Sequence, residues 1–401
     1  MATTVRPYGN DLTETDTVDA SGTPLFVQVG FTVQPKLADL EGYPFCSPET
    51  TENEIVGSYG FILRRTGSDA SGSRPAIPNI QKVALPVDPL LPLTDIQVRN
   101  GIAYVSADST TAGDPDLLIF DIRDPTSAKL LASLNTGPGI AAFALAGKRV
   151  YAAAASTAAQ LHIVRLDSLG SMILEKKYQL ALPYATATPP MASAIAYDRG
   201  KVYLGTEKWD GSEFDILDVS SPLSPVEKGA LEIGSKVNDI YVTGDDAYIA
   251  TAAMGQLQAI DVHDPPHLAV AASFSPSGWQ RQEGEVVTGF EGGIDLGRTS
   301  GGYDVAGDHE AFVWTATSSP VLSAAASLNI PGGAYGMLSD RSHTFMATRQ
   351  PDAEFRIADA RLGTATSTAY ALPIAPQKMT CDGRRLYILA HQAPYIYEIS
   401  F

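Results

Sequence analysis

Cysteine is scarce in this chain, with only Cys46 and Cys381 among 401 residues. Two cysteines so far apart fit no metal-ligand spacing, and they leave two alternatives open, one disulfide between them or two buried free thiols. Long apolar runs are also missing: no stretch of about 18 apolar residues could span a membrane as a helix. The N-terminus lacks the basic start and apolar core of a signal peptide, so either the protein is kept in the cytosol or a leader is missing.

Positive charge is in short supply as well. The 28 Lys and Arg residues face 45 Asp and Glu residues, which gives a formal net charge of -17. Nucleic acids and anionic membranes bind Lys/Arg patches, so this balance disfavours both; it suits solubility, cations or a basic partner. Catalytic signatures are absent too, since the chain has no GxSxG, HExxH, P-loop or GxGxxG motif. We therefore predict that the protein is not an enzyme.

What the chain has is a repeat. With 44% hydrophobic and 18% charged residues it is globular, and residues 93–137 contain four short apolar runs separated by turn signals. The first run ends at Asn100-Gly101, a pair typical of a tight hairpin turn, and the third ends at Asp124-Pro125. This pattern predicts a four-stranded β-meander.

The same unit recurs downstream at spacings of roughly 40 to 50 residues, the length of one propeller blade. The centres of the successive second strands are Tyr104, Tyr151, Tyr203, Tyr248, Asp295, Phe345 and Tyr387. The repeat therefore predicts an all-β fold, a seven-bladed β-propeller of four-stranded blades.

The seventh unit stops one strand short, at Phe401. Residues 79–89 have the pattern of a fourth strand and precede the first unit, so we predict that they close the ring by pairing with the last blade, which removes an exposed sheet edge. The alternative is a simple linker. We divide the chain into a small β-rich extension and linker at 1–78, with strand-like runs at 24–33 and 54–65, and the propeller at 79–401.

The third strands LLIFDIRDP, FDILDVSSP and LQAIDVHDP, with AYV before them, resemble the LVIVD repeats of bacterial and archaeal β-propellers. The resemblance covers residues 79–401 loosely. It implies a propeller of the kind usually found in exported or surface-attached proteins, without a shared catalytic motif, and it assigns no functional residue.

Strand alternation places the loops between second and third strands on the same face as the connections between blades. The longest and most varied segments lie there, as binding loops on a rigid scaffold do. Their aromatic and charged side chains could bind a glycan, a peptide or a protein by stacking and directed hydrogen bonds, or could simply be solvated. The candidate ligand-binding residues are Tyr184, Trp209, Asp210, Trp279, Arg281, Tyr303, Asp308, His309, Glu310 and Arg349.

Two short segments contain side chains of the kinds that bind metal ions. Asp114 and Asp116 could offer oxygen ligands to calcium, but their spacing does not match an EF-hand and solvated acidic loops are commoner. His263 and His267 occupy a position where other units need only a turn, so we predict a structural turn there. We predict no cofactor beyond this calcium alternative.

The favoured function is a non-enzymatic binding or display scaffold, extracellular or on a cell or particle surface, that engages a protein or glycan but no nucleic acid. One alternative is a structural or decoration protein of a virion or filament, anchored in a larger assembly by residues 1–78. Another is a metal-dependent propeller hydrolase or lyase, for which His309 and Glu310 are candidates. Neighbours in a strand point their side chains apart, which argues against that pair.

Overall fold

The repeat unit folds into a four-stranded antiparallel sheet. In the first unit, β4 (Leu93–Arg99) turns into β5 (Ile102–Ala107) at Asn100 and Gly101, whose φ angles of 52° and 71° lie in the left-handed region that Asn and Gly tolerate best. β6 (Leu117–Asp121) and β7 (Lys129–Leu134) complete this sheet, which is blade one.

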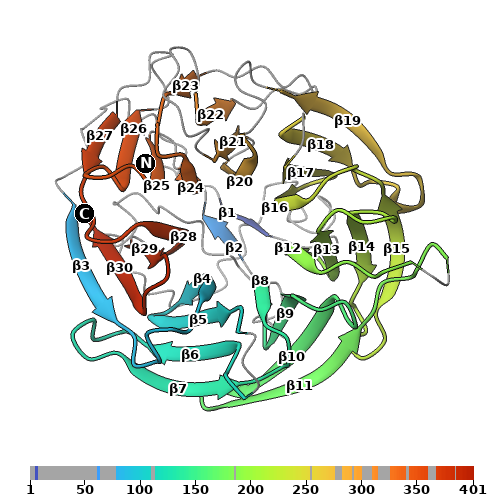
Figure 1. Ribbon diagram of the computed structural model, residues 1–401, viewed down its shortest axis with the longest axis horizontal. Helices are drawn as coiled ribbons and strands as arrows, with labels where there is room; N and C mark the ends of the chain where they lie inside the picture. Colours follow the sequence, from blue (N-terminus) through green and yellow to red (C-terminus); the bar gives the residue numbers. More distant parts are fainter. Residues whose placement is uncertain are drawn as a thin grey trace, which may run out of the picture.

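Six more blades follow in chain order, and Figure 1 shows all seven arranged in a ring with the first strand of each nearest the axis. Blades two to four are β8 (Ile140–Ala146), β9 (Arg149–Ala154), β10 (Leu161–Ser168), β11 (Ser171–Tyr178); β12 (Ala192–Asp198), β13 (Lys201–Thr206), β14 (Phe214–Asp218), β15 (Val226–Leu231); and β16 (Val237–Thr243), β17 (Asp246–Thr251), β18 (Leu257–Asp261), β19 (Ala269–Phe274). Blades five to seven are β20 (Gly284–Phe290), β21 (Gly293–Arg298), β22 (Ala311–Trp314), β23 (Ala326–Leu328); β24 (Ala334–Ser339), β25 (His343–Thr348), β26 (Phe355–Asp359), β27 (Ser367–Tyr370); and β28 (Pro376–Asp382), β29 (Arg385–Ala390), β30 (Tyr395–Ser400), β3 (Asn79–Ala84). The predicted seven-bladed propeller is confirmed.

The last blade takes its outer strand from the other end of the chain. β3 pairs antiparallel with β30, from Asn79 opposite Ser400 to Ala84 opposite Tyr395. In Figure 1 the blue β3 lies beside the red β30. The predicted closing strand within residues 79–89 is therefore confirmed. By pairing with β30, β3 covers a strand edge that would otherwise be exposed.

Apolar clusters join the blades. The buried residues form seven clusters, each containing residues from two neighbouring blades around the ring. The aromatic centre of the second strand takes part: Tyr104 of blade one packs against Phe143 of blade two. Blade five departs from this pattern, because Asp295 is buried there and accepts a hydrogen bond from Ser339 of blade six.

A polar side chain just before the third strand clamps the end of the fourth strand in several blades. Its side-chain oxygen accepts a backbone N–H from the segment that leaves the blade, which satisfies a donor that would otherwise be buried without a partner. These pairs are Thr136 N to Asp116 at 2.8 Å, Leu180 N to Gln160 at 2.9 Å, Ile233 N to Glu213 at 2.8 Å, Ile330 N to Glu310 at 2.5 Å and Leu372 N to Glu354 at 2.9 Å.

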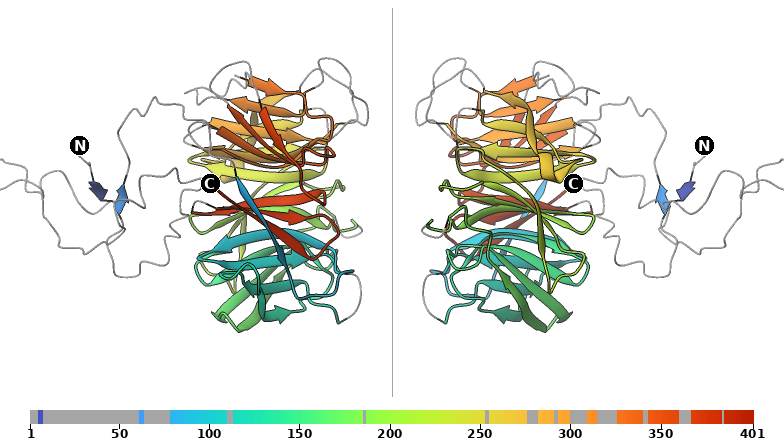
Figure 2. Two further views of the ribbon diagram at one scale, coloured as in Figure 1. Left: turned by 90° about the vertical axis from the view of Figure 1, so that its left-hand side faces the viewer. Right: turned by 90° about the vertical axis from the view of Figure 1, so that its right-hand side faces the viewer.

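The computed structural model describes residues 5–7, 61–63, 78–109, 113–184, 187–252, 255–275, 282–290, 293–299, 309–314, 326–339, 343–359, 367–383 and 385–401. Within these ranges no helix is long and apolar enough to cross a membrane. β1 (Val5–Pro7) and β2 (Phe61–Leu63) pair antiparallel. The rest of the predicted β-rich extension, including the run at 24–33, lies outside the described residues. Figure 2 shows the blades from the side, where they form a disc.

Candidate functional site

The register of the strands decides which loops share a face. In blade three, Ala192 at the start of β12 pairs with Thr206 at the end of β13, so the segment that enters the blade and the loop after β13 emerge together. The same register holds in blade seven, where Pro376 pairs with Ala390. We call this side the loop face. The other side carries the turns between first and second strands, and we call it the turn face.

An aromatic surface lies on the loop face at blade three. It consists of Tyr184, Met191, Trp209 and Asp210, and we call it the aromatic ledge. The side chains of Tyr184 and Met191 are 48% and 43% exposed. The Tyr184 hydroxyl donates a hydrogen bond to the Asp210 carboxylate, which raises the pKa of this phenol above its usual value.

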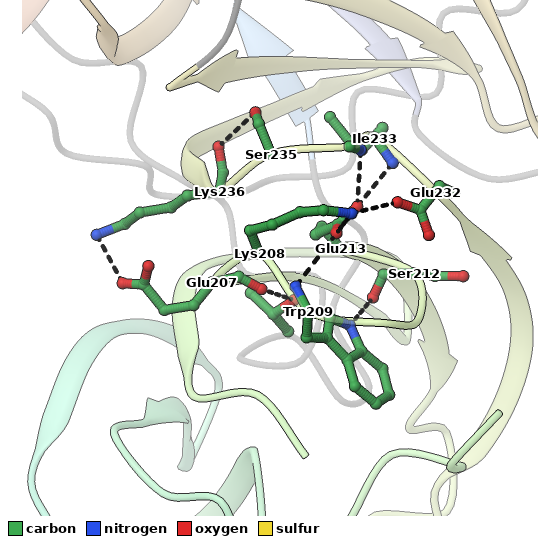
Figure 3. Close-up of polar contacts among 11 residues, drawn as sticks. Glu207, Lys208, Trp209, Ser212, Glu213, Glu232, Ile233, Ser235 and Lys236 are labelled. Carbon is green, nitrogen blue, oxygen red and sulfur yellow. Dashed lines mark hydrogen bonds and ion pairs between the residues drawn. The ribbon is translucent and has the colours of Figure 1, made fainter. Parts of the chain in front are cut away.

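The indole of Trp209 is held by its own loop. Its Nε1 donates to the Ser212 carbonyl oxygen at 2.7 Å, a contact drawn in Figure 3. A Cβ at Gly211 would lie only 2.3 Å from the ring atom Cζ2 of Trp209, so the ring can take this position only over a glycine. The ring is thus fixed before any ligand arrives.

An ion-pair bridge fixes the base of the same loop. Lys208 Nζ lies 2.9 Å from the buried Glu213 and 2.6 Å from Glu232 at the end of the blade, as Figure 3 shows. Hydrogen bonds to Glu232 and Glu213 raise the pKa of Lys208 above its usual value. Because Glu213 also accepts the N–H groups of Ile233 and Gly234, at 2.8 and 2.9 Å, the loop is tied to the frame of the blade.

A second polar site lies at the loop-face mouth of the central channel. Lys378 Nζ of β28 is 3.6 Å from Asp239 Oδ1 of β16. These strands belong to blades seven and four, which are not neighbours, so the contact crosses the axis of the ring. Asp95 of β4 and Glu285 of β20 also interact electrostatically with Lys378. We call Asp95, Asp239, Glu285 and Lys378 the channel cluster.

The four channel charges perturb one another. Burial raises the pKa values of Asp95 and Glu285, and the Lys378 ammonium only partly offsets this. Burial by itself would lower the pKa of Lys378, but the negative charges of Asp239, Asp95 and Glu285 outweigh it and raise the pKa. Lys378 is therefore an ammonium ion at neutral pH, suited to stabilising negative charge rather than to acting as a nucleophilic amine.

Strand irregularities bring these side chains to the channel. Every inner strand has a register shift near its start, for example between Val237 and Asp239 in β16 and between Pro376 and Lys378 in β28. Such bulges re-aim side chains and are frequent next to functional sites. Two of the acids also link blades, since Asp95 accepts the Phe143 N–H at 3.0 Å and Asp239 accepts the Val287 N–H at 3.1 Å.

Arg349, predicted as a ligand-binding residue, lies beside the channel cluster. Its guanidinium stacks on the Tyr335 ring at 3.8 Å, donates to Gln377 Oε1 at 2.9 Å and acts on the charge of Glu285. His391 also contacts Gln377, at 2.5 Å, and burial followed by the Arg349 charge lowers the pKa of its imidazole. The structure thus places Arg349 at the channel mouth rather than on the ledge.

The structure does not bring the other predicted site residues together. His309 contacts Ser327 Oγ at 2.5 Å while Glu310 points inward as a clamp, so the two neighbours diverge. Asp116 is a clamp as well, and Asp114 accepts a hydrogen bond from Ser109 at 2.9 Å. Trp279, Arg281, Tyr303 and Asp308 lie outside the described residues. Among the residues that the structure does describe, no group of three or more His, Cys, Asp or Glu side chains is placed to hold a metal ion.

The remaining predictions concern the turn face and the cysteines. Residues Pro265–His267 form a short 3-10 turn, and His267 Nδ1 lies 2.8 Å from Asp264, within the turn that the repeat predicts. Cys381 lies in β28 and is disulfide-bonded. Its predicted partner Cys46 lies outside the described residues, so that pairing stays a prediction.

Sequence reasoning missed the channel cluster. Its signal was present, because Asp95, Asp239 and Lys378 occupy the third position of an inner strand, where blades two and three have Ala142 and Ala194. Charge at a position that the other four blades fill with uncharged residues, Ala142, Ala194, Val286 and Gly336, marks a site that does not serve packing alone. Only the closed ring shows that these charges meet.

Two parts of the chain match a repeat family. Residues 209–232 and 234–275 match the LVIVD repeat, and with the fold above they show a seven-bladed β-propeller containing LVIVD repeats. The matched region includes Trp209 and Asp210 of the ledge. No curated protein is similar enough to this chain to count as a relative.

Solved structures share the fold at low identity. Virginiamycin B lyase from Staphylococcus aureus has 12% identity and a TM-score of 0.54, over 81% of this chain and 100% of that one. A putative 6-phosphogluconolactonase from Bacteroides uniformis has 11% identity and a TM-score of 0.54, over 69% and 85%. The computationally designed Ika8 protein has 11% identity and a TM-score of 0.52, over 80% and 98%. At these identities the similarity shows the fold alone.

Proposed function

We propose that this protein is a non-enzymatic binding scaffold that engages a protein or glycan partner through the aromatic ledge of its loop face. The observation that carries the proposal is the fixed position of two aromatic rings at the surface, Tyr184, which is exposed, and Trp209, which is partly exposed. Tyr184 is held by Asp210, and Trp209 is held by its bond to the Ser212 carbonyl oxygen. A long loop that only connects two strands does not need aromatic rings held at the surface in this way.

Fixed rings favour binding for an energetic reason. Ordering a side chain on association costs about 0.5 to 1.5 kcal/mol, and a ring already in place does not incur that cost again. Trp and Tyr are also the residues that contribute most often to binding hot spots, and their flat faces stack on sugars and on peptide side chains. Asp210 adds a carboxylate beside the rings that can accept hydrogen bonds from a partner.

For the setting, we propose an extracellular, cell-surface or particle-surface location, supported by the LVIVD repeats and their resemblance to exported propellers. A role as a virion or filament component anchored by residues 1–78 is the alternative. Deleting residues 1–78 separates the surface scaffold from the virion or filament component. If these residues are the anchor, the shortened protein stays folded but is no longer incorporated into the assembly.

Replacing Trp209 with alanine is expected to weaken partner binding by at least about tenfold, which corresponds to about 1.4 kcal/mol. Binding is measured on printed glycan and peptide arrays, and then by titration of the best probe. Tyr184→Phe, which keeps the ring and removes only the bond to Asp210, is expected to lose less than Tyr184→Ala. Leu223→Ala is the matched control, because Leu223 is 58% exposed on the turn face of the same blade. Equal losses in Trp209→Ala and Leu223→Ala would refute the proposed surface.

A second candidate function is acid–base catalysis at the channel mouth, favoured by the desolvated charges of the channel cluster. Perturbed pKa values gather at active sites. The raised pKa of Glu285 suits a general acid, and the Lys378 ammonium would stabilise negative charge that develops on a substrate. This combination fits the hydrolysis of an ester or lactone, or an elimination.

In that case Lys378→Met is expected to lower kcat/KM by at least about a hundredfold against whichever lactone, ester or glycoside of a test panel the wild type converts. Lys208→Met is the control, since Lys208 pairs with Glu213 at 2.9 Å and with Glu232 at 2.6 Å on the same face. Circular dichroism checks that both variants fold. Wild-type protein that converts no member of the panel would favour the scaffold.

A further inference from the structure

A cleft of about 250 Å³ opens on the turn face between blades three and four. It lies on the opposite side of the ring from the aromatic ledge and the channel cluster, and the proposed function does not use it. Its walls come from the turn between β12 and β13, the turn between β16 and β17, and the segment after β18. The lining residues are Asp198, Arg199, Lys201, Tyr203, Gly244, Asp245, Val262 and His263.

Arg199 holds the cleft open as a bridge between the two blades. Its Nε donates to Asp198 Oδ2 at 2.8 Å within blade three, and its NH2 group donates to the Gly244 carbonyl oxygen of blade four at 2.8 Å. The residue adopts a φ of 42°, which is uncommon for a residue other than glycine and places this side chain across the gap. One guanidinium therefore links the two walls of the cleft.

Several groups on the walls remain available to a ligand. Among the described residues, the side chains of Lys201 and Asp245 make no hydrogen bond or ion pair; the backbone carbonyl of Asp245 accepts the Val262 N–H at 2.8 Å. Tyr203 lines the cleft from the core, with 2% of its surface exposed; burial raises the pKa of its phenol to about 12, so this hydroxyl stays protonated at neutral pH. The cleft thus offers a strong donor, a strong acceptor and a hydroxyl within one small volume.

The charges in the cleft balance. Asp198 and Asp245 carry two negative charges, and Arg199 and Lys201 carry two positive charges. A balanced site gives no net electrostatic preference for an anion or a cation, while its charged groups need hydrogen-bonding partners and exclude an apolar ligand. A hydroxyl group both donates and accepts, so adjacent hydroxyls satisfy a carboxylate and an ammonium at the same time.

We propose that this cleft binds a neutral polyhydroxyl ligand, one pyranose sugar unit, either as a free monosaccharide or as a residue of a glycan. The ring hydroxyls would accept from Lys201 and donate to Asp245, with the Tyr203 phenol as a further hydrogen-bonding group of the lining. His263, which the repeat pattern explains only as a turn residue, borders the same cleft and adds a further polar contact. The volume admits a single sugar unit and excludes a larger folded ligand.

The test measures binding of free sugars by saturation-transfer NMR and by calorimetry. The probes are glucose, galactose, mannose, fucose, xylose and N-acetylglucosamine, each at about 10 mM because isolated sugar sites commonly bind at millimolar Kd. Glucosamine and glucuronate, which keep the pyranose ring, are the charged comparisons. We expect at least one neutral sugar to bind, and each charged analogue to bind at least about fivefold more weakly than its parent, because a site of balanced charge does not repay the desolvation of an added ionic group.

Variants assign the site. Lys201→Met and Asp245→Ala are expected to reduce binding of that sugar by at least about tenfold, because each removes a charged hydrogen-bond partner. Lys148→Met is the matched control, since Lys148 lies exposed at the corresponding turn of blade two. A loss of sugar binding in Trp209→Ala but not in Lys201→Met would place the sugar on the aromatic ledge and overturn the cleft proposal, which separates this site from the proposed function. A glycan array then distinguishes a free monosaccharide from a residue within a chain. The proposal is overturned if no neutral sugar binds, if the charged analogues bind equally well, or if Lys201→Met and Asp245→Ala leave binding unchanged.

Discussion

Replacing Val83 with aspartate is expected to lower the free energy of unfolding by at least about 4 kcal/mol, because an unpaired carboxylate would be buried at the closure of the ring. Val83 lies in β3 with none of its surface exposed, and packs with Tyr387, Leu389 and Ile396 of its own blade and with blade one. β3 joins the two ends of the propeller, so its loss would leave β30 as an open edge.

Urea unfolding followed by tryptophan fluorescence measures this effect. Ala84→Asp is the matched control, since Ala84 is the next residue of the same strand, pairs with Tyr395 and is exposed. It is expected to change the unfolding free energy by less than about 0.5 kcal/mol, as surface substitutions usually do. Similar midpoints for Val83→Asp and wild type would show that the ring does not depend on this closure.

Asp295→Asn is expected to stabilise the protein at pH 8, by up to about 4 kcal/mol, and to leave its stability nearly unchanged at pH 4. Burial raises the pKa of Asp295 to about 7, although donation from Ser339 partly offsets it. The folded state therefore keeps a proton that the unfolded chain releases at about pH 3.9, so wild-type stability falls as pH rises from about 4 to about 7. Asparagine cannot ionise and removes this loss.

The contribution of His162 to the stability of the protein is expected to change with pH in the opposite direction. Burial, and then the charge of Lys177, lower the pKa of His162 to about 4, and its Nδ1 lies 3.0 Å from the Thr136 hydroxyl, which in turn donates to Asp116. Its contribution is therefore present above about pH 6.5 and is lost as pH falls towards about 4, an amount of about 3 kcal/mol. Gln258 occupies the corresponding third-strand position in blade four, so His162→Gln uses a side chain that the repeat already accommodates.

Urea unfolding at a series of pH values between 4 and 8 tests both variants against the wild type. Because the two wild-type slopes oppose each other between about pH 4 and 6.5, each single variant should expose the slope of the other residue, and the double variant should be flatter than either. If the difference in unfolding free energy between variant and wild type does not change with pH for either single variant, neither residue titrates as proposed.

The fold followed from local patterns. Asn100-Gly101 predicted a turn because few residue pairs tolerate two positive φ angles, and the two residues adopt 52° and 71°. The recurring Tyr104, Tyr151 and Tyr203 predicted blades because each aromatic centre must be buried against a neighbour. The closing strand was also predictable, because the seventh unit lacks a fourth strand and residues 79–89 have the fourth-strand pattern. Pairing the two completes the seventh blade.

The candidate sites were predictable only in part. Tyr184, Trp209 and Asp210 were found because they lie in long loops, and the loop face follows from strand alternation. Glu310 and Asp116 were candidates for the same reason, but the structure gives both carboxylates a backbone partner in the next segment. A carboxylate in a loop and a carboxylate that clamps a strand look alike until the fourth strand is placed beside it.

The sequence by itself therefore determined the all-β repeat, the number of blades, the closure of the ring and the face that bears the long loops, because these depend on local turn chemistry and alternation. Only the tertiary structure decided which side chains meet. Asp239 and Lys378 are far apart in the chain and lie 3.6 Å apart across the axis, and the cleft between blades three and four depends on one arginine spanning two turns. Contacts of this kind form because the closed ring brings residues of different blades together, and the local sequence pattern of each blade does not depend on which residues of another blade lie nearby.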